Sequence, residues 1–152
     1  MNLKDCYDSG MLRKASMPKD VVEKEIKNAE RHLANARRCV EQKMYDLAMV
    51  AIYTSMFHAA RAVLFKDGIK ERSHICVILY IEEKYPDLRR FARLMDGYRR
   101  SRHTVLYGIE DEAVEKDAEQ GLEDGRDIID AIKKVCDLPP SEKGAGPSNR
   151  KG

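Results

Sequence analysis

The stretch DLAMVAIYTSMFHAARAVLF, residues 46–65, decides the fold of this 152-residue chain. Its apolar side chains lie on nearly every face when the stretch is coiled as an α-helix. A helix at a protein surface has one apolar stripe, whereas a helix that is apolar all round is enclosed by neighbours. We therefore predict a central helix, from about Tyr45 to Lys66, that other helices surround.

The segment before the central helix predicts a surface helix of about 22 residues. Ser16 and Pro18 favour a helix start, because a serine side chain caps free N–H groups and proline is tolerated in the first turn. From Val22 to Val40, apolar residues recur at spacings of three and four, with Lys, Glu and Arg between them. This spacing is typical of one apolar stripe that faces a core.

Turn residues delimit the next helix. Gly68, just past the central helix, suits a left-handed C-terminal cap, and residues 69–72 are expected to form a short loop. Ser73 is placed to cap a third helix. This helix is expected to end at about Tyr85, because Pro86 pushes the preceding residue out of the helical conformation.

Two more helices complete the prediction. The fourth begins near Asp87 and ends at Gly108, and its apolar stripe comprises Leu88, Phe91, Met95 and Tyr98 and continues to Val105. The fifth begins at the acidic run 110–112, because negative charge is favourable at the positive end of the helix dipole. Small residues on its inner face would let another helix approach closely, namely Ala118, Gly121 and Gly125.

These signals predict an all-α protein, an up-down bundle of about five antiparallel helices joined by short loops. We assign residues 1–17 to a weakly patterned N-terminal segment, 18–138 to the helical bundle and 139–152 to a disordered C-terminal tail. The tail has no apolar side chain larger than Ala or Pro, so burial cannot offset the entropy of ordering it.

Composition limits the function. The net charge of +2 does not by itself require a nucleic acid or a membrane as partner. The cysteines are scattered without a C-x-x-C pair, so we expect small buried thiols in a reducing compartment and no metal site; they are Cys6, Cys39, Cys76 and Cys136. We see neither the apolar core of a signal peptide nor an apolar run of the roughly 20 residues that span a bilayer. We expect a cytoplasmic protein with no membrane contact and no cofactor.

One charge stands where the fourth helix should be apolar. Continuing its stripe by four residues from Tyr98 places Arg102 in the middle of the apolar arc, at about 100° per residue. A guanidinium there must be paired or solvated. It either pairs with an acidic residue or extends past the helix end, or it lines a polar cleft that receives a phosphate. Periodicity leaves both alternatives open.

The surrounding segment is rich in arginine. Six arginines occur in residues 89–102. Three of them share a face roughly opposite Arg102, namely Arg89, Arg93 and Arg100. Such a strip could attract a phosphate backbone, but clusters of this kind are more often the solvated face of a helix, and acidic residues 110–119 follow directly.

The central helix carries one polar line, Thr54, His58 and Arg61, at positions i, i+4 and i+7. The line predicts either a hydrogen-bonded seam within the bundle or a ligand cleft. We assign His74 to a helix start and expect His32 to be exposed. The sequence has no Gly-rich phosphate loop, no G-x-S-x-G and no H-E-x-x-H motif.

The stretch YTSMFHAARAVLFKDGI, residues 53–69, resembles the central helix of the HEPN (higher eukaryote and prokaryote nucleotide-binding) family. It is most similar to the small standalone prokaryotic branch, in which a Gly loop and a Ser-His helix start follow, here Ser73-His74. The segment RHTVLYG, residues 102–108, and the order of the helices also match. The resemblance covers about residues 20–136.

The resemblance implies a helical bundle that forms a homodimer. Many HEPN domains are metal-independent endoribonucleases with the motif Arg, four to six residues, then His, and others are non-catalytic partners of minimal nucleotidyltransferases. Arg102 matches the Arg, and His103 matches the polar residue that often follows it, but Tyr107 occupies the position of the His. A phenol, with a pKa near 10, is less suited than imidazole to take the 2′-hydroxyl proton at neutral pH.

We therefore expect a homodimer that binds the phosphate of a nucleotide or RNA, as the non-catalytic partner of a nucleotidyltransferase in a toxin–antitoxin-like pair. The expected binding residues are Arg102, Arg99, His58, Arg61 and Thr54. One alternative is a metal-independent endoribonuclease whose candidate catalytic residues are Arg102, His103 and Tyr107. The other is a pure protein-interaction module.

Overall fold

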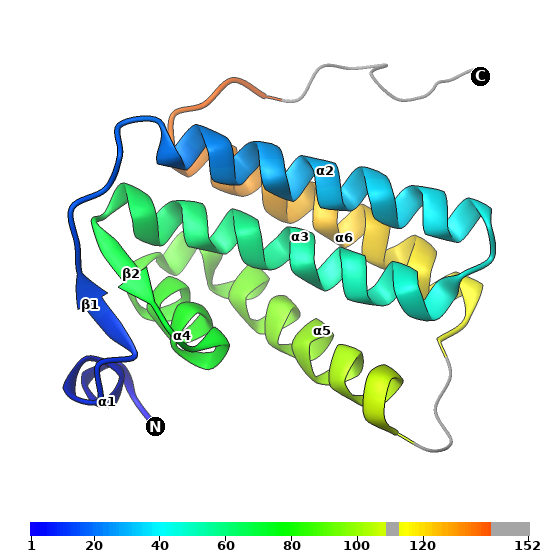
Figure 1. The fold of residues 1–152 in the computed structure, drawn as a ribbon, viewed down its shortest axis with the longest axis horizontal. Coiled ribbons are helices and arrows are strands. Elements are labelled where there is room, and N and C mark those ends of the chain that lie inside the picture. The colour runs from blue at the N-terminus through cyan, green and yellow to red at the C-terminus, as the bar shows by residue number, and fades with distance from the viewer. Residues whose placement is uncertain (109–112, 141–152) are drawn as a thin grey trace.

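Six α-helices account for most of the chain in a computed structural model, which describes residues 1–108 and 113–140. Figure 1 shows their arrangement. In chain order the helices are α1 (Leu3–Asp8), α2 (Val21–Glu41), α3 (Tyr45–Lys66), α4 (His74–Lys84), α5 (Arg89–Tyr107) and α6 (Glu115–Val135). The two short strands are β1 (Leu12–Lys14) and β2 (Ile69–Glu71). The prediction of an all-α bundle is confirmed.

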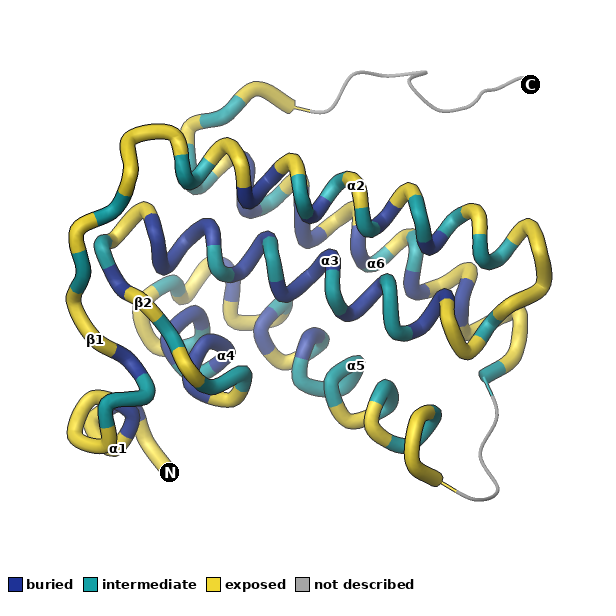
Figure 2. The backbone as a smooth tube through the Cα atoms, in the orientation of Figure 1, coloured by how far each residue is buried: buried dark blue, intermediate teal, exposed yellow. Residues whose placement is uncertain are grey.

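Helix α3 lies at the centre of the bundle. Helices α2 and α6 pack against it, and α4 and α5 approach it from another side (Figure 1). Buried residues occur on several faces of α3, as the dark blue along this helix shows in Figure 2. Ile52, Met56 and Leu64 are each fully buried. The prediction that the most apolar stretch forms an enclosed helix is therefore confirmed.

The small residues of α6 do allow close helix packing. A Cβ atom built on Gly121 would lie 2.7 Å from Cδ1 of Ile52, and one built on Gly125 would lie 2.8 Å from Cδ1 of Leu33. Both distances are shorter than van der Waals contact, so α6 approaches α3 and α2 only because these side chains are absent. The close approach lies within the subunit.

The predicted turn signals occur where expected. Gly68 has a φ of 72°, in the left-handed region that glycine adopts without steric penalty. The side chain of Ser73 accepts a hydrogen bond of 3.2 Å from the backbone N–H of Cys76 and caps α4. Pro86 opens a short 3₁₀-helix, η1 (Pro86–Leu88), that leads into α5.

Two helix starts differ from their predicted positions. Helix α2 begins at Val21, after an N-cap at Asp20, rather than at Pro18. Helix α6 begins at Glu115, whereas the acidic run 110–112 that we expected to open it lies outside the described residues. Most of the predicted C-terminal tail, residues 141–152, also lies outside them.

The N-terminal segment and the expected loop at 69–72 together form a small sheet. Strands β1 and β2 are antiparallel, and Leu12 pairs with Glu71. The prediction of a loop was wrong because local sequence cannot show that β1 supplies a partner strand. Leu12 is almost fully buried by this pairing.

Cys6 of α1 and Cys76 of α4 form a disulfide bond across a sequence separation of 70. Both residues are fully buried, because α1 packs against α4. The expectation of reduced thiols is therefore wrong for this pair, since helical periodicity gives no information on a contact so distant along the chain. Cys39 and Cys136 are free thiols and half-buried.

Helix α3 is long and apolar enough, by length and composition, to cross a membrane. The prediction that no apolar run reaches the length of a bilayer span is therefore wrong by length and composition. However, 67% of the most apolar 18-residue stretch of this helix is buried inside the bundle. Burial of this kind is typical of a core helix.

Candidate functional site at the α3–α4–α5 junction

Arg102 lies near the C-terminal end of α5, on the side of that helix that faces α3. Helix α5 buries Ala92 and Met95, and Arg102 continues the same face. The guanidinium carbon of Arg102 lies 5.0 Å from the centre of the Tyr53 ring on α3. A cation over an aromatic face is attracted by the ring quadrupole, so this contact holds the side chain inward.

The guanidinium of Arg102 has no protein partner for its charge among the described residues. Its Nε atom is buried and donates no hydrogen bond to an acceptor within residues 1–108 or 113–140. A buried polar group without a partner is energetically unfavourable by about 1–3 kcal/mol. An unpaired cation held against an aromatic ring therefore has capacity for an anionic ligand.

An aromatic cluster lies next to Arg102. The rings of Phe57 and His74 are stacked with their centres 3.9 Å apart, and the hydroxyl of Tyr53 lies 2.8 Å from Nδ1 of His74. Tyr53 and Phe57 are one turn apart on α3, and His74 is the first residue of α4. The N-terminus of α4 thus meets α3 and α5 at one point.

Burial and positive charge keep His74 neutral. Burial lowers the pKa of the imidazole below its ordinary value, and the nearby charges of Arg102, Arg99 and Arg61 lower it further. Burial also raises the pKa of Tyr53 to about 12, although Arg102 and Arg99 act in the opposite direction. At neutral pH the junction therefore holds a neutral imidazole and a neutral phenol beside cationic arginines.

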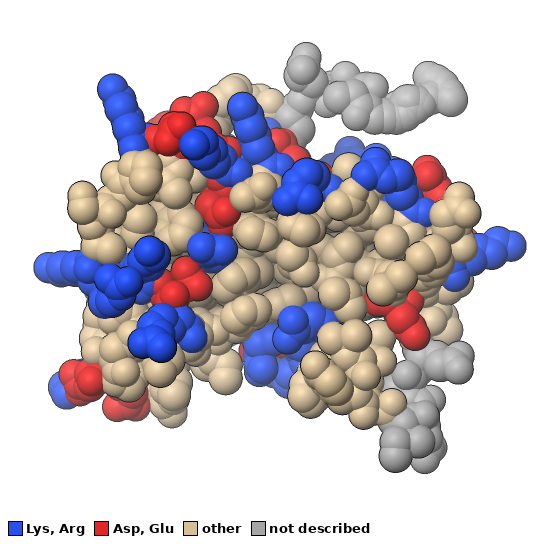
Figure 3. Space-filling model, viewed as in Figure 1, with Lys and Arg blue, Asp and Glu red and all other residues tan. Residues whose placement is uncertain are grey.

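Arg99, one turn before Arg102 on α5, is partly neutralised. Its Nε atom lies 3.0 Å from Oδ1 of Asp96, which also pairs with Arg100. Asp96 and Arg99 line a groove of about 440 Å³ between α4 and α5, which does not include Arg102. Figure 3 shows Lys and Arg atoms gathered over the region where α5 passes below α3.

The ionisable members of the polar line, His58 and Arg61, pair with carboxylates of the bundle, although Nε of Arg61 is buried and donates no hydrogen bond among the described residues. Nδ1 of His58 lies 2.9 Å from Oε2 of Glu25, and Arg61 lies 3.6 Å from the same oxygen. Arg61 also pairs at 3.2 Å with Glu71 of β2. The hydroxyl of Thr54 donates a hydrogen bond of 2.8 Å to the carbonyl oxygen of Val50. These contacts form a structural seam, so we do not place a ligand on this line.

Glu25 is the centre of this seam. Burial alone would raise the pKa of its carboxyl, but hydrogen bonds to His58 and Asn28 and the charges of Arg61 and His58 lower it overall. His32, expected to be exposed, is half-buried and stacks on His58 with ring centres 5.0 Å apart. The seam thus ties α2 to α3, and Arg61 extends toward β2.

Comparison with known proteins identifies the family. The family model described as HEPN domain matches residues 22–135, which is most of the chain. The chain belongs to the HEPN family. A crystal structure of ST0689, an archaeal HEPN homologue, superposes with a TM-score of 0.60 at 26% sequence identity, covering 75% of this chain and 96% of that one.

Two curated relatives come from Methanocaldococcus jannaschii. The protein named "Putative toxin MJ0142" is 28% identical over 118 residues, which cover 74% of this chain and 80% of the relative. The protein named "Putative toxin MJ0605" is 28% identical over 135 residues, which cover 80% of this chain and 96% of the relative. The chain is therefore a HEPN-type protein with toxin-like relatives.

The HEPN motif positions at the end of α5 diverge in space. Helix α5 continues to Tyr107, and five residues along a helix rotate a side chain by roughly 140°. Tyr107 is 71% exposed, and its ring contacts that of His103, which is also exposed, at 4.9 Å between centres. Within one subunit, neither His103 nor Tyr107 lies on the face that carries Arg102.

His74 is the site residue that sequence reasoning missed. We assigned it to a helix start, which is correct, but the same position brings its ring to Tyr53 and into the field of Arg102. The Ser73-His74 pair of the HEPN resemblance was the available signal. Within residues 1–108 and 113–140, no group of three or more His, Cys, Asp or Glu residues is placed to hold a metal ion.

Proposed function

We propose that this HEPN-family protein binds the phosphate group of a nucleotide or RNA at Arg102, beside the Tyr53–His74 pair. The observation that carries the proposal is the guanidinium of Arg102, which is half-buried and has no acidic partner among the described residues. A phosphate accepts two parallel hydrogen bonds from a guanidinium, which makes arginine the preferred residue for such a ligand.

Arg99 adds positive charge to the same region. Its pairing with Asp96 leaves the arginine half-buried in the α4–α5 groove, where a ligand chain can approach. Phe57 and Tyr53 supply aromatic faces next to Arg102, but both are buried, so they position His74 and Arg102 rather than stack on a base. The ligand is thus recognised chiefly through its phosphate.

Binding is tested by the melting temperature of the protein in the presence of ATP, GTP and RNA oligonucleotides. A ligand at 1,000 times its dissociation constant adds about 4 kcal/mol to the free energy of unfolding. We expect Arg102→Gln to abolish this increase. Arg90→Gln is the matched control, because Arg90 lies on the same helix, is exposed and does not line the α4–α5 groove.

A melting temperature that does not change with any of these ligands contradicts the proposal, and so does equal binding by the two variants. For RNA, replacing Arg102 should also reduce the dependence of log affinity on log salt concentration by about 0.7, the value for one phosphate contact on a single strand.

We propose further that the protein acts as a homodimer in the cytoplasm and pairs with a minimal nucleotidyltransferase in a toxin–antitoxin-like system. The HEPN resemblance supports the dimer and the partner, and the names of the two M. jannaschii relatives, which contain the word toxin, support only the toxin-like role. Light scattering measures the molar mass in solution, and a mass of one chain rather than two contradicts the homodimer. Purification of the tagged protein from its native host, followed by mass spectrometry, identifies the partner, and the absence of any nucleotidyltransferase there counts against it.

Metal-independent RNA cleavage is a second candidate function, and the position of His74 favours it. A neutral imidazole with a lowered pKa is suited to accept the 2′-hydroxyl proton, and Arg102 would stabilise the phosphate in the transition state. Labelled RNA in EDTA tests the activity. Cleavage by wild type that is lost in both His74→Ala and Arg102→Gln supports it, and uncut RNA eliminates it.

A further inference from the structure

A second groove lies between α2 and α6, apart from the α3–α4–α5 junction. Its volume is about 630 Å³, and its lining comes from α2, α6 and the segment Leu138–Pro140 that follows α6. No residue of α4 or α5 lines it. Ligand binding here is therefore independent of Arg102.

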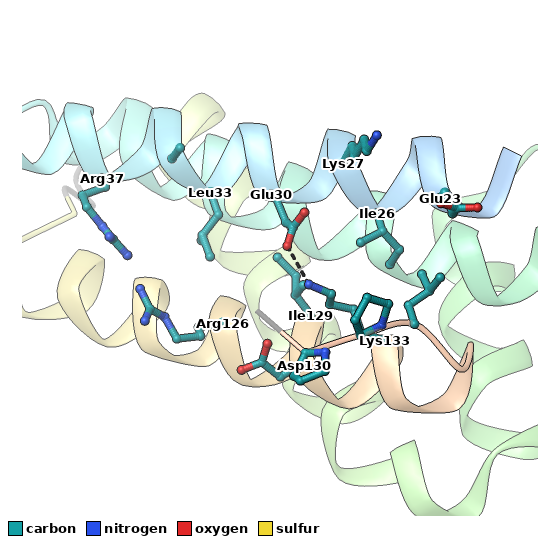
Figure 4. A pocket seen from close by; sticks show the side chains of 14 residues that line it. Glu23, Ile26, Lys27, Glu30, Leu33, Arg37, Arg126, Ile129, Asp130 and Lys133 are labelled. Atoms are coloured by element: carbon teal, nitrogen blue, oxygen red, sulfur yellow. Dashed lines mark hydrogen bonds and ion pairs between the residues drawn. The ribbon is translucent and has the colours of Figure 1, made fainter. Parts of the chain in front are cut away.

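Two arginines face each other at one end of this groove. Figure 4 shows Arg37 extending from α2 and Arg126 extending from α6 toward the same space. Lys133 pairs with Glu30 at 2.9 Å, and neither arginine forms a hydrogen bond or ion pair with a described residue. The positive charges at this end are thus not neutralised by a direct contact with a described carboxylate.

The two charges act on each other. Burial lowers the pKa of Arg37, and the charge of Arg126 lowers it further, whereas Glu41 acts in the opposite direction without forming an ion pair. Arginine keeps its charge in proteins, so the like charges remain and repel each other. An oxyanion between them would convert this repulsion into two charge-assisted hydrogen-bonding interactions.

The middle of the groove is apolar. Leu33 of α2 and Ile129 of α6 are largely buried beneath it. Ile26 lies two turns nearer the start of α2, on the side away from the arginines (Figure 4). The Lys133–Glu30 ion pair crosses the groove between the helices. A ligand held at the two arginines therefore lies next to the apolar surface of Leu33 and Ile129. The Lys133–Glu30 ion pair lies on the far side of that surface from the arginines.

We propose that the Arg37–Arg126 end of the α2–α6 groove binds the oxyanion group, a phosphate or a carboxylate, of a small organic molecule whose apolar part lies over Leu33 and Ile129. Planar guanidinium groups present paired N–H donors that match both kinds of oxyanion.

Titration calorimetry with phenyl phosphate, benzoate and neutral benzyl alcohol tests the proposal. Wild type is expected to bind at least one of the two anions and to bind benzyl alcohol much more weakly. The double variant Arg37→Gln with Arg126→Gln should weaken the binding at least tenfold, since a hydrogen bond to a charged group contributes that much or more. The tighter of the two anions identifies the head group.

Two controls separate this site from other basic surfaces. Arg38→Gln removes the neighbouring exposed arginine of α2, which bonds to Asn35, and should leave the affinity unchanged. The titrations are repeated in the Arg102→Gln background, which removes phosphate binding at Arg102 and should keep the binding at this groove, so failure of the phosphate site at Arg102 and failure of this site are distinguishable. Melting temperatures show that each variant is folded.

The proposal is overturned by any of three results: neither anion binds wild type at about 10 mM, the double variant binds as tightly as wild type, or Arg102→Gln rather than the double variant loses the binding.

Discussion

Breaking the Cys6–Cys76 disulfide should lower the stability of the whole bundle. The bond closes a loop over a sequence separation of 70, which includes α2, α3 and both strands. In the loop-entropy model, a cross-link over about 70 residues stabilises the folded state by about 4 kcal/mol relative to the unfolded chain. For a protein of this size, that corresponds to a decrease of roughly 10 °C in melting temperature.

The assay is thermal unfolding, with and without a reductant, of a variant in which both free cysteines, Cys39 and Cys136, are serine. This variant keeps the disulfide as its only pair of cysteines, so reduction changes one bond. The matched variant Cys6→Ser with Cys76→Ser should have a lower melting temperature than the disulfide-bonded protein, and the reductant should not change it. Comparing the oxidised and reduced forms of the first variant avoids the separate effect of placing serine at two fully buried positions, because Cys6 and Cys76 are unchanged in it.

The reasoning is refuted if thiol titration shows that reduction releases two thiols while the melting temperature stays within about 2 °C. A small change of that kind would mean that only α1 and β1 detach when the bond breaks. Among the described residues, the only elements that helix α1 contacts extensively are α4 and β1, so such local opening is the specific alternative.

Three further predictions concern single side chains. Arg102→Gln should raise the pKa of His74, because it removes one of the positive charges that lower it, and an NMR titration of the imidazole measures this change; an unaltered pKa would show that the two groups do not interact. Gly121→Ala should lower the free energy of unfolding by about 1–3 kcal/mol, because the added Cβ overpacks the core. Gly97→Ala, in open space on α5, should raise it by up to about 1 kcal/mol, and urea denaturation measures both changes. The Glu25 carboxyl has a lowered pKa in the folded state, so its contribution to stability is complete above its unfolded pKa near 4.3 and is lost as the pH falls through the lower folded pKa. Glu25→Gln should therefore reduce the acid dependence of unfolding, and an identical pH profile for the variant would contradict the seam.

Local chemistry explains why the helices were predictable. Gly68 and Ser73 act on backbone atoms within a few residues, and the all-round apolar character of α3 is a property of one segment. The partner of Cys6 lies 70 residues away along the chain. The residues of strand β1 pair with residues 55 to 59 positions away, from Lys14 with Ile69 to Leu12 with Glu71. No local pattern encodes such contacts.

In the candidate site too, local features were predictable from the sequence and contacts between distant segments were not. Helical periodicity placed Arg102 on the inner face of α5, and the structure puts it there. It did not distinguish the line of Thr54, His58 and Arg61 from a ligand cleft, because the acidic partners of His58 and Arg61 belong to α2 and β2. Nor did it connect His74 to Arg102, since the ring reaches the site only when α4 docks on α3.

The inward position of Arg102 also explains the state of its neighbours. Three arginines lower the pKa of His74, and one of them, Arg61, is already paired with carboxylates. Arg102 differs because no described carboxylate pairs with it, so its charge acts on the imidazole undiminished. An anion bound at Arg102 would reduce that charge and raise the pKa of His74 toward its ordinary value. Proton uptake by His74 and anion binding are therefore coupled, and each favours the other as the pH falls toward the range in which imidazole titrates.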